Sequence, residues 1–531
     1  MSLLVLKKNK MFNFFKKWKV EILTIFIIGI AVTYTALVIG NYTTLSDDGA
    51  ITYRFAERIS EGKGFTYNDG EYVNGASNPL YTLILGLFNL FIGNIQITGY
   101  ILGVLFLVLT LIITSILLIK YQNLFSFLIY IGLITANYFI LTNYFIGLEA
   151  GLTCLLISLL FLFLYSENDV GIGIVLGLLV ANKLDGAVVA LAFTIIYMIM
   201  KKGKFPLKIS IIALITTLPI FGILYYYFGT IIPHSLLSKT IGPAHNIVSD
   251  FDNFWMIKLI FNMNSMLIYL FFISLIGLCF RRKLADFVLP IYLVIYVLAY
   301  SIVNLGDKYP WYSVPAVYVI ILIVSIYGGS IVVKLLNYFR KIYEDRVQVI
   351  KPNQLVSTIL IILSTLAFML FLIYFNVTKY DWDRGLYSWE KGDLLRATAG
   401  VWLKKNVLQT ELVETGWGLP AFEFKGRVYD TSGLCSDFTK WQKPVYLVRA
   451  FNPNDNIPLI LSTEYYLSVT FKMDEANSYY AVYSNKESSF KDKLLVNSKF
   501  EIYKIIEASD FSFINNRQKE SIKDIKIEIY P

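Results

Sequence analysis

Apolar residues occur along this chain in long runs separated by short polar connections. An α-helix needs about 20 consecutive apolar residues to cross the hydrocarbon core of a bilayer. The runs therefore predict a polytopic α-helical membrane protein with about 11 transmembrane helices. The predicted spans are residues 22–42, 97–119, 124–142, 148–165, 170–182, 186–200, 207–228, 262–280, 284–303, 311–333 and 355–376.

One further apolar run, residues 79–93, is only about 15 residues long, which is too short to cross comfortably. If it stays at one face, as a re-entrant or surface helix, the basic residues gather in one alternate set of connections. These include Lys120, 201–204, 281–283 and 334–354. Because lysine and arginine accumulate in cytoplasmic loops, the pattern predicts a cytoplasmic N-terminus. The connections predicted outside are 43–96, 143–148, 183–185, 229–261, 304–310 and everything after residue 376.

The first outer connection, residues 43–96, contains a folded polar stretch. Four apolar residues recur at helical spacing and predict an amphipathic helix lying on the membrane surface. Asp47 and Asp48 stand at its beginning, where the helix dipole favours negative charge. Residues 68–70, Asn-Asp-Gly, predict a hairpin turn after the helix. The apolar stripe consists of Ala50, Ile51, Phe55 and Ile59.

The pattern changes near residue 380 and divides the chain into a transmembrane part, 1–379, and a C-terminal part, 380–531. Polar residues become more frequent, and short patterned segments replace the long apolar runs. They predict a soluble, extracytoplasmic α/β domain. The predicted helix is 396–406, and the predicted strands are 412–417, 427–430, 446–451, 459–470 and 499–507.

Composition agrees with a membrane protein and excludes an ordinary globular one, since 56% of the residues are hydrophobic and 16% are charged. The formal charge of +9 reports membrane orientation if the basic residues cluster as predicted, and does not by itself indicate nucleic acid. Cys154 and Cys279 fall in apolar runs and Cys435 stands alone, so no disulfide framework is implied. The sequence has no zinc-like cluster of cysteine and histidine and no glycine-rich phosphate loop.

The predicted topology brings a set of charged residues to one water-facing surface. A carboxylate there can take the proton of an attacking hydroxyl, and cations can stabilise the charge that develops on a departing phosphate. Such a surface suits the transfer of a group from an anionic lipid to a neutral acceptor. The set comprises Asp47, Asp48, Glu149, Asp185, Asp307, Arg54, Lys183, Lys239 and His234.

Residues 45–82, which begin Leu-Ser-Asp-Asp-Gly-Ala-Ile-Thr, resemble the first outer loop of the GT-C glycosyltransferases. These multi-spanning enzymes use polyprenyl-phosphate-linked sugars at the outer membrane face. The resemblance is strongest to the branch that contains the mycobacterial terminal arabinofuranosyltransferase, and weaker to the aminoarabinose transferase and protein mannosyltransferase-like enzymes. Four later stretches agree in order: 145–149, 183–186, 227–239 and 414–434. The chain departs from the family pattern at Lys183, Leu184 and His234, where arginine, proline and asparagine are usual.

The resemblance implies a role for each candidate residue. Asp47 is the expected catalytic base, with Asp48 supporting it, and a divalent ion such as Mg²⁺ or Mn²⁺ bridging the two acids is compatible with the superfamily. Two carboxylates alone do not establish a metal site, so no cofactor is assigned. The implied donor-phosphate ligands are Lys183, Lys239 and Arg54, and the implied substrate-binding residues are Glu149, Asp185, His234, Asp307, Trp311 and Tyr312.

Structural roles compete with these assignments. Asp47 would serve as a helix cap, and Arg54 would pair with a glutamate of its own helix. The lysines would extend to the membrane interface, and Glu149 would cap the helix that follows it. Trp311 and Tyr312 fit either an interfacial aromatic belt or a surface on which a sugar stacks.

The sequence therefore predicts an inverting GT-C glycosyltransferase, hexosyl or pentosyl, in the cytoplasmic membrane. Its donor would be a polyprenyl-phosphate-linked sugar, and its acceptor an envelope glycan, glycolipid or protein at the outer face. A lipid or solute transporter is one alternative, and it would show paired halves and ionisable groups deep in broken helices. A non-catalytic membrane scaffold is the other, and it would leave the one-sided clustering of acids and lysines unexplained.

Overall fold

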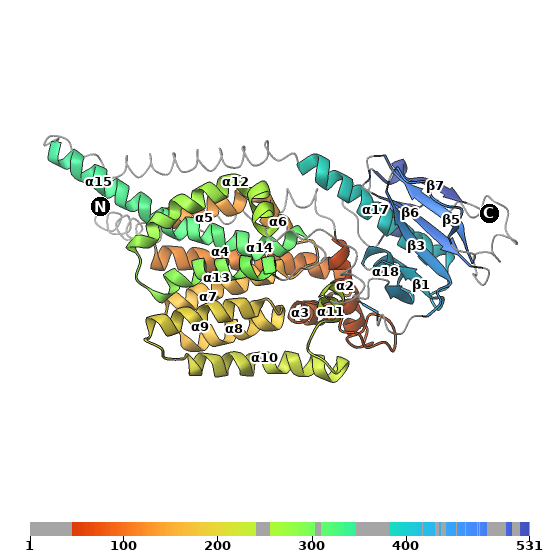
Figure 1. The fold of residues 1–531 in the computed structure, drawn as a ribbon, viewed down its shortest axis with the longest axis horizontal. Helices are drawn as coiled ribbons and strands as arrows, with labels where there is room; N and C mark the ends of the chain where they lie inside the picture. Colours follow the sequence, from red (N-terminus) through yellow and green to blue (C-terminus); the bar gives the residue numbers. More distant parts are fainter. Residues whose placement is uncertain are drawn as a thin grey trace, which may run out of the picture.

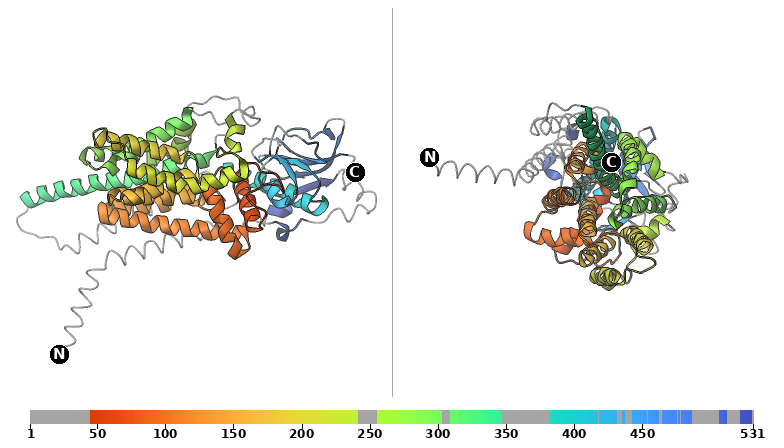
Figure 2. Two further views of the ribbon diagram at one scale, coloured as in Figure 1. Left: turned by 90° about the horizontal axis from the view of Figure 1, so that it is seen from below. Right: turned by 90° about the vertical axis from the view of Figure 1, so that its left-hand side faces the viewer.

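The structure is a computed structural model that describes residues 45–240, 255–302, 309–346, 382–485 with short gaps, 506–511 and 521–529. The predicted spans 22–42 and 355–376 and residue Asp307 lie outside the described residues. Helices aligned with the long axis of the molecule form the helical part, residues 45–346, and a sheet with its own helices forms the sheet part, residues 382–529, at one end (Figures 1 and 2).

The helices of the helical part follow the apolar runs of the sequence. Asn94, Asn123 and Asn168 cap three of them, since each side chain accepts from the backbone N–H groups of the first turn. The helices are α4 (Ile95–Tyr121), α5 (Leu124–Ala136), α6 (Tyr138–Thr142), α7 (Ala150–Tyr165), α8 (Asp169–Asn182), α9 (Gly186–Met200), α10 (Leu207–Phe228), α11 (His234–Thr240), α12 (Trp255–Leu275), α13 (Leu284–Ile302), α14 (Val314–Ile323) and α15 (Gly329–Arg346). The single turn η3 (Pro310–Ser313) precedes α14, and a π-helical turn, η4 (Val324–Gly328), connects α14 to α15.

Within the described residues, four helices are long and apolar enough to cross a membrane, and a fifth is added if the bent pair within 255–280 counts as one. They are Ile95–Tyr121, Leu207–Phe228, Leu284–Ser301 and Pro310–Tyr338. Other predicted spans correspond to shorter apolar helices, so the count of about 11 spans remains a prediction.

Side-chain contacts show which connections share an end of the helical part. At one end Arg281 donates to Gln122 Oε1 at 2.6 Å and also bonds the Ser330 hydroxyl. At the other end Lys183 Nζ lies 2.7 Å from Glu149 Oε1. The basic connection at 281–283 and the acid-bearing connections therefore lie at opposite ends of the helical part. The predicted alternation of inside and outside connections requires this.

Helix α3 (Pro79–Ile92) stays at the end where helix α2 (Asp47–Ser60) lies. Near its C-terminus, Asn89 donates to Ser60 Oγ at 2.7 Å and accepts from Thr98 Oγ1 at 3.0 Å. Both partners belong to this end, because Ser60 closes α2 and Thr98 opens α4. The apolar run 79–93 therefore does not extend to the opposite end, in agreement with the sequence-based prediction.

The beginning of α2 matches the prediction, but its surroundings do not. Arg54 and Arg58 are 2% and 7% exposed, although they lie outside the predicted apolar stripe. The helix is enclosed because α3 and, from the sheet part, α18 (Leu419–Phe424) both pack on it (Figure 1). The expected surface-lying helix is thus a buried joint between the two parts of the molecule.

The sheet part contains helices α17 (Trp382–Asn406) and α18 and a mixed sheet. Strand order is β2-β1-β3-β6-β5-β4, with β7 also paired to β5; β1 runs parallel to β2 and β3, and the other pairs are antiparallel. The strands are β1 (Val413–Thr415), β2 (Val428–Asp430), β3 (Tyr446–Phe451), β4 (Ile460–Leu461), β5 (Tyr465–Lys472), β6 (Tyr479–Ser484) and β7 (Lys526–Ile529).

The strand predictions are confirmed in part. Strand β3 has the predicted bounds, whereas the predicted strand 459–470 is broken into β4 and the start of β5. The sequence analysis missed β6 and β7, and most of the predicted strand 499–507 lies outside the described residues. The sheet part is nevertheless α/β, as its pattern indicated.

Candidate functional site

The first turn of α2 is fixed to the connection that precedes α7. Ser46, the N-cap, accepts from Gly49 N at 2.9 Å, and both its backbone N–H and its hydroxyl donate to Ile146 O. Gly49 lies so close to this carbonyl that an added Cβ would overlap it, and the facing Gly147 has a φ of +87°. The first turn of α2 is therefore held beside Glu149.

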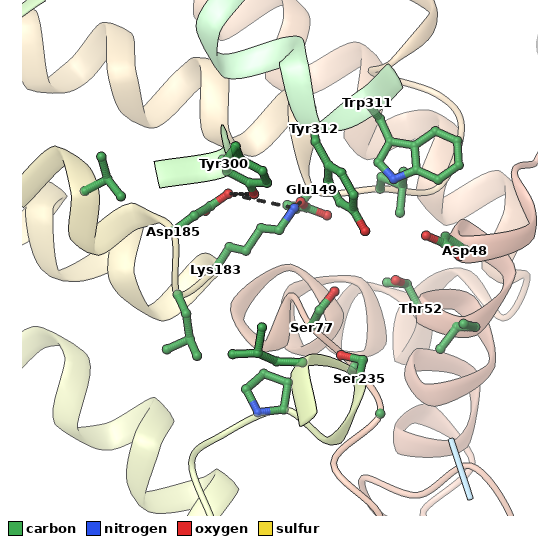
Figure 3. Close-up of a pocket in the computed structure, with 18 of the residues that line it drawn as sticks. Asp48, Thr52, Ser77, Glu149, Lys183, Asp185, Ser235, Tyr300, Trp311 and Tyr312 are labelled. Atoms are coloured by element: carbon green, nitrogen blue, oxygen red, sulfur yellow. Dashed lines mark hydrogen bonds and ion pairs between the residues drawn. The ribbon is translucent and has the colours of Figure 1, made fainter. Parts of the chain in front are cut away.

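An open pocket of about 1300 Å³, including its mouth, lies at this end of the helical part (Figure 3). It is formed by α2, α11, the ends of α8 and α13, the start of α9, the turn η3 and the connections before α3 and α7. Its lining consists of Asp48, Ile51, Thr52, Gly75, Ala76, Ser77, Leu148, Glu149, Lys183, Leu184, Asp185, Val188, Pro233, Ser235, Leu236, Ala299, Tyr300, Trp311 and Tyr312.

Asp48 and Lys183 occupy opposite sides of this pocket. Figure 3 shows Asp48 and Thr52 on the side formed by α2, with Lys183 and Asp185 across from them. The aromatic side chains of Trp311 and Tyr312 come from a third side. This arrangement brings together residues that are up to 264 positions apart in the sequence, from Asp48 to Tyr312.

Lys183 is held in place by its neighbours. Its Nζ atom lies 2.7 Å from Glu149 Oε1 and 4.0 Å from Asp185 Oδ2, and 5.0 Å from the centre of the Tyr312 ring. Glu149 occupies the N-cap position of α7, but its side chain makes no capping hydrogen bond. Its second oxygen instead accepts from Asn78 Nδ2 at 2.9 Å. The carboxylate of Glu149 thus serves the lysine rather than the helix end.

Asp185 is fixed by two tyrosines of α13. Tyr300 donates to Asp185 Oδ2 at 2.6 Å, and the Tyr296 hydroxyl oxygen lies 3.3 Å from the same atom. Tyr296 donates to Tyr312 O at 2.9 Å, which connects α13 to the turn η3. Nearby, the rings of Tyr309 and Trp311 stack at a centroid distance of 4.4 Å and an angle of 8°. The aromatic side of the pocket is consequently rigid and presents flat apolar surface.

Asp47 is directed to the sheet part and does not line the pocket. Its carboxylate lies 3.0 Å from Arg396 Nη1 and accepts from the Leu419 backbone N–H at 2.8 Å. Burial raises the pKa of Asp47 to about 6, although the nearby Arg396 guanidinium acts in the opposite direction. Gly418, at φ +84°, lies against this carboxylate at a position where a side chain would overlap it.

Arg54 also serves the joint between the two parts. It donates to the backbone carbonyls of Tyr67 at 2.9 Å and Gly426 at 2.7 Å, and to that of Ala421. It also donates to Asn68 Oδ1 at 3.1 Å. These contacts do not include the expected pairing with a glutamate of α2. Arg54 is also absent from the pocket lining, so its side chain is not placed to contact a donor phosphate in the pocket.

Two further candidates, His234 and Lys239, belong to helix α11. His234 begins α11, and its backbone N–H donates to Asn74 O at 2.6 Å; its neighbours Pro233 and Ser235 line the pocket. Lys239 belongs to the same helix, but its side chain, like Asp307, lies outside the described residues. A role for Lys239 therefore stays a prediction.

The two acids of the expected pair have different surroundings. Asp47 is engaged by Arg396 and the Leu419 backbone N–H, whereas Asp48 lines the pocket. Across the described part of the chain, no group of three or more His, Cys, Asp or Glu side chains is arranged to hold a metal ion.

Sequence reasoning missed several residues that complete the site. Asn78 lies in the Asn-Pro pair before α3, and its buried side chain contacts Glu149. Tyr300 was hidden in an apolar run, and Arg396 in a segment predicted only as a helix. The one signal in the sequence was the asparagine directly before a helix-starting proline, because asparagine there usually marks a helix start. Its contact with Glu149 is visible only in the structure.

Comparisons with known proteins give a fold but no close relative. No protein-family model matches the chain, and no curated protein is similar to it. The crystal structure of ArnT from Cupriavidus metallidurans bound to undecaprenyl phosphate is similar, with a TM-score of 0.54 and 11% identity, covering 88% of this chain and 98% of that one. The apo structure of the same protein gives a TM-score of 0.50, also at 11% identity, over 86% and 97%. The chain therefore has the ArnT fold.

Proposed function

We propose that this protein is an inverting GT-C glycosyltransferase that uses a polyprenyl-phosphate-linked sugar. The observation that carries the proposal is the pocket itself, in which Asp48 and Lys183 occupy facing sides. The ArnT fold supports it, because one ArnT structure was solved with undecaprenyl phosphate bound. The sugar is a hexose or pentose, and the acceptor an envelope glycan, glycolipid or protein.

We assign the general base to Asp48 rather than to Asp47. Asp48 lines the pocket, whereas the neighbouring acid is paired with Arg396. In the transfer, the acceptor oxygen attacks the anomeric carbon and its proton passes to the Asp48 carboxylate. The bond from that carbon to the phosphate oxygen breaks, and polyprenyl phosphate leaves with its bonding electron pair. Attack from the side opposite the phosphate inverts the anomeric configuration.

Lys183 supplies the positive charge for the departing phosphate. Negative charge on the phosphate increases as the bond to the sugar breaks, so an ammonium fixed beside it stabilises the transition state more than the bound donor. Lys239, on the helix that forms part of the pocket wall, is proposed as the second cation. Trp311 and Tyr312 provide flat surface for a sugar ring, and Asp185 and His234 are retained as candidate sugar ligands.

The pocket opens at the end opposite the basic connection 281–283. Because basic connections face the cytoplasm, the pocket and the sheet part would face outward from the cytoplasmic membrane. This orientation suits a lipid-linked donor, since the polyprenyl chain can stay in the bilayer while its phosphate enters the pocket from the side.

A donor-turnover assay tests the proposal. Purified protein in lipid nanodiscs is given undecaprenyl-phosphate sugars and a cell-envelope acceptor fraction, and released undecaprenyl phosphate and glycosylated product are measured. Lys183→Met should lower kcat as well as raise the donor KM, so that kcat/KM for the donor falls about 100-fold, because a charge-assisted contact that strengthens in the transition state is lost. A defect confined to the acceptor KM would contradict the phosphate role.

A further inference from the structure

A continuous series of buried hydrogen bonds connects α2 to the pocket lysine. Thr52 Oγ1 lies 3.2 Å from Asn78 Oδ1, Asn78 Nδ2 donates to Glu149 Oε2 at 2.9 Å, and Glu149 Oε1 holds Lys183 Nζ at 2.7 Å. Thr52, Asn78 and Glu149 are 3%, 1% and 7% exposed. The series begins one helical turn from Asp48 and ends at the group across the pocket from it.

The orientation of the Asn78 amide is determined by its neighbours. The Glu149 carboxylate can only accept a hydrogen bond, so the amide nitrogen of Asn78 is directed to it. The amide oxygen lies 3.0 Å from the Thr82 hydroxyl, and Thr52 Oγ1 lies 3.2 Å from both amide atoms. Asn78 occupies the N-cap of α3, a position where asparagine usually bonds the helix backbone, but here it makes no side-chain cap. The side chain is therefore committed to Glu149.

Position 78 requires an uncharged hydrogen-bond donor. An amide N–H satisfies one carboxylate oxygen without adding charge, which leaves the negative charge of Glu149 to hold Lys183. An acid at position 78 would repel Glu149 at close range, and an apolar residue would leave a buried carboxylate oxygen without its donor.

We propose that Asn78 is a positioning residue that orients Glu149, and through it fixes Lys183 in the pocket opposite Asp48. The inference rests on the proposed function, and it changes the role of Glu149 from a sugar ligand to a support for the phosphate-binding cation. Asn78 thereby influences how the enzyme uses its lipid-linked sugar donor without contacting that donor.

A double-mutant cycle tests the inference. Asn78→Ala should raise the donor KM about tenfold and leave the acceptor KM unchanged, because only the position of Lys183 is loosened. In a Glu149→Gln background the same substitution should change the donor KM less than twofold, since the connection is already broken. Thr82→Val is the matched control, because it removes a hydroxyl from the same amide but keeps the contact to Glu149. Equal effects of Asn78→Ala in both backgrounds, or a change in the acceptor KM alone, would overturn the proposal.

A second variant keeps the test valid if Asn78→Ala does not fold. Asn78→Asp places two carboxylates together, so activity should fall at neutral pH and recover at lower pH, where they share a proton. A flat ratio of variant to wild-type activity across pH would count against the inference. Failure of the proposed function is distinguishable, because wild-type protein would then release no undecaprenyl phosphate from any donor. Binding of undecaprenyl phosphate to the same variants would still report the coupling.

Discussion

Helix α2 carries two acids that are adjacent in the sequence and differ in their surroundings. Asp48 lines the open pocket together with Thr52, whereas Asp47 is buried against Arg396 and the Leu419 backbone N–H. Successive side chains on an α-helix point about 100° apart, so neighbouring residues of an enclosed helix meet different partners. One side of α2 belongs to the pocket and the other to the sheet part.

The comparison shows that a buried acid beside a candidate site need not be part of the chemistry. Asp47 has the perturbed pKa, which often marks a catalytic group, yet its partners are those of a structural joint. Arg54 is a second example of a buried charged group with a structural role, since its guanidinium donates to backbone carbonyls of the joint. Joint and pocket lie on one helix, and five substitutions separate their contributions.

The largest expected effect is on the pocket side. Asp48→Asn should lower kcat about 1000-fold, because it removes the group that accepts the proton of the attacking hydroxyl. Asp47→Asn is the control, since it keeps the shape and an acceptor for the Leu419 N–H, and it should retain most of the activity. Turnover by both variants is measured with the donor assay. The comparison would be reversed if Asp47→Asn were inactive and Asp48→Asn active.

The next effect is on the stability of the joint. Arg54→Met should lower the free energy of unfolding by about 4 kcal/mol, because three buried carbonyls lose their donor. Arg427→Met, in a half-exposed pair with Glu71, should cost less than about 1 kcal/mol. Denaturant unfolding of the purified protein in detergent measures both. Similar losses for the two arginines would show that burial at the joint does not matter.

Asp47 should make stability depend on pH. The folded protein holds the Asp47 proton up to about pH 6, whereas the unfolded chain releases it near 3.8. The contribution of this group to the free energy of unfolding is therefore complete below pH 3.8 and is lost as the pH rises through 6, a change of about 3 kcal/mol. Asp47→Asn should remove this dependence. Unfolding midpoints from pH 4 to 7 that are parallel for wild type and variant would refute the assignment.

The smallest effect belongs to the ion pair at the edge of the joint. Lys425 and Glu57 connect α18 to α2, and their side chains are 25% and 22% exposed. Lys425→Met should lower the free energy of unfolding by about 1 kcal/mol, because a partly solvated pair gains little over its hydrated ions. Activity should stay near that of wild type. A loss as large as that of Arg54→Met would place this pair among the main contacts of the joint.

Local pattern was sufficient for part of the fold. The apolar runs located helices such as α4 and α10, the Asn68-Asp69-Gly70 turn is present with Gly70 at φ +71°, and the strand 446–451 was predicted with its observed bounds. These features depend on contacts between near neighbours and on the period of apolar positions. The broken strand β4–β5 was missed because no local signal marks where a partner strand ends.

The candidate site was predicted only as a set of residues. Glu149, Lys183, Asp185, Trp311 and Tyr312 do line one pocket, since each stands at the same end of its helix and topology alone brings such ends together. The sequence could not indicate that Asn78 joins them, because its partner lies 71 residues away.

The sequence by itself determined that a pair of acids lies in the first turn of a helix, and that this helix is next to long apolar helices. Helix starts and apolar runs are both encoded by residues close together in the chain. Tertiary structure alone decided which acid faces the pocket. That choice depends on Arg396 and Leu419, more than 300 residues along the chain, packing against one side of α2. The surroundings of a side chain on this helix are set by the surfaces that meet it, and these come together only in the folded protein.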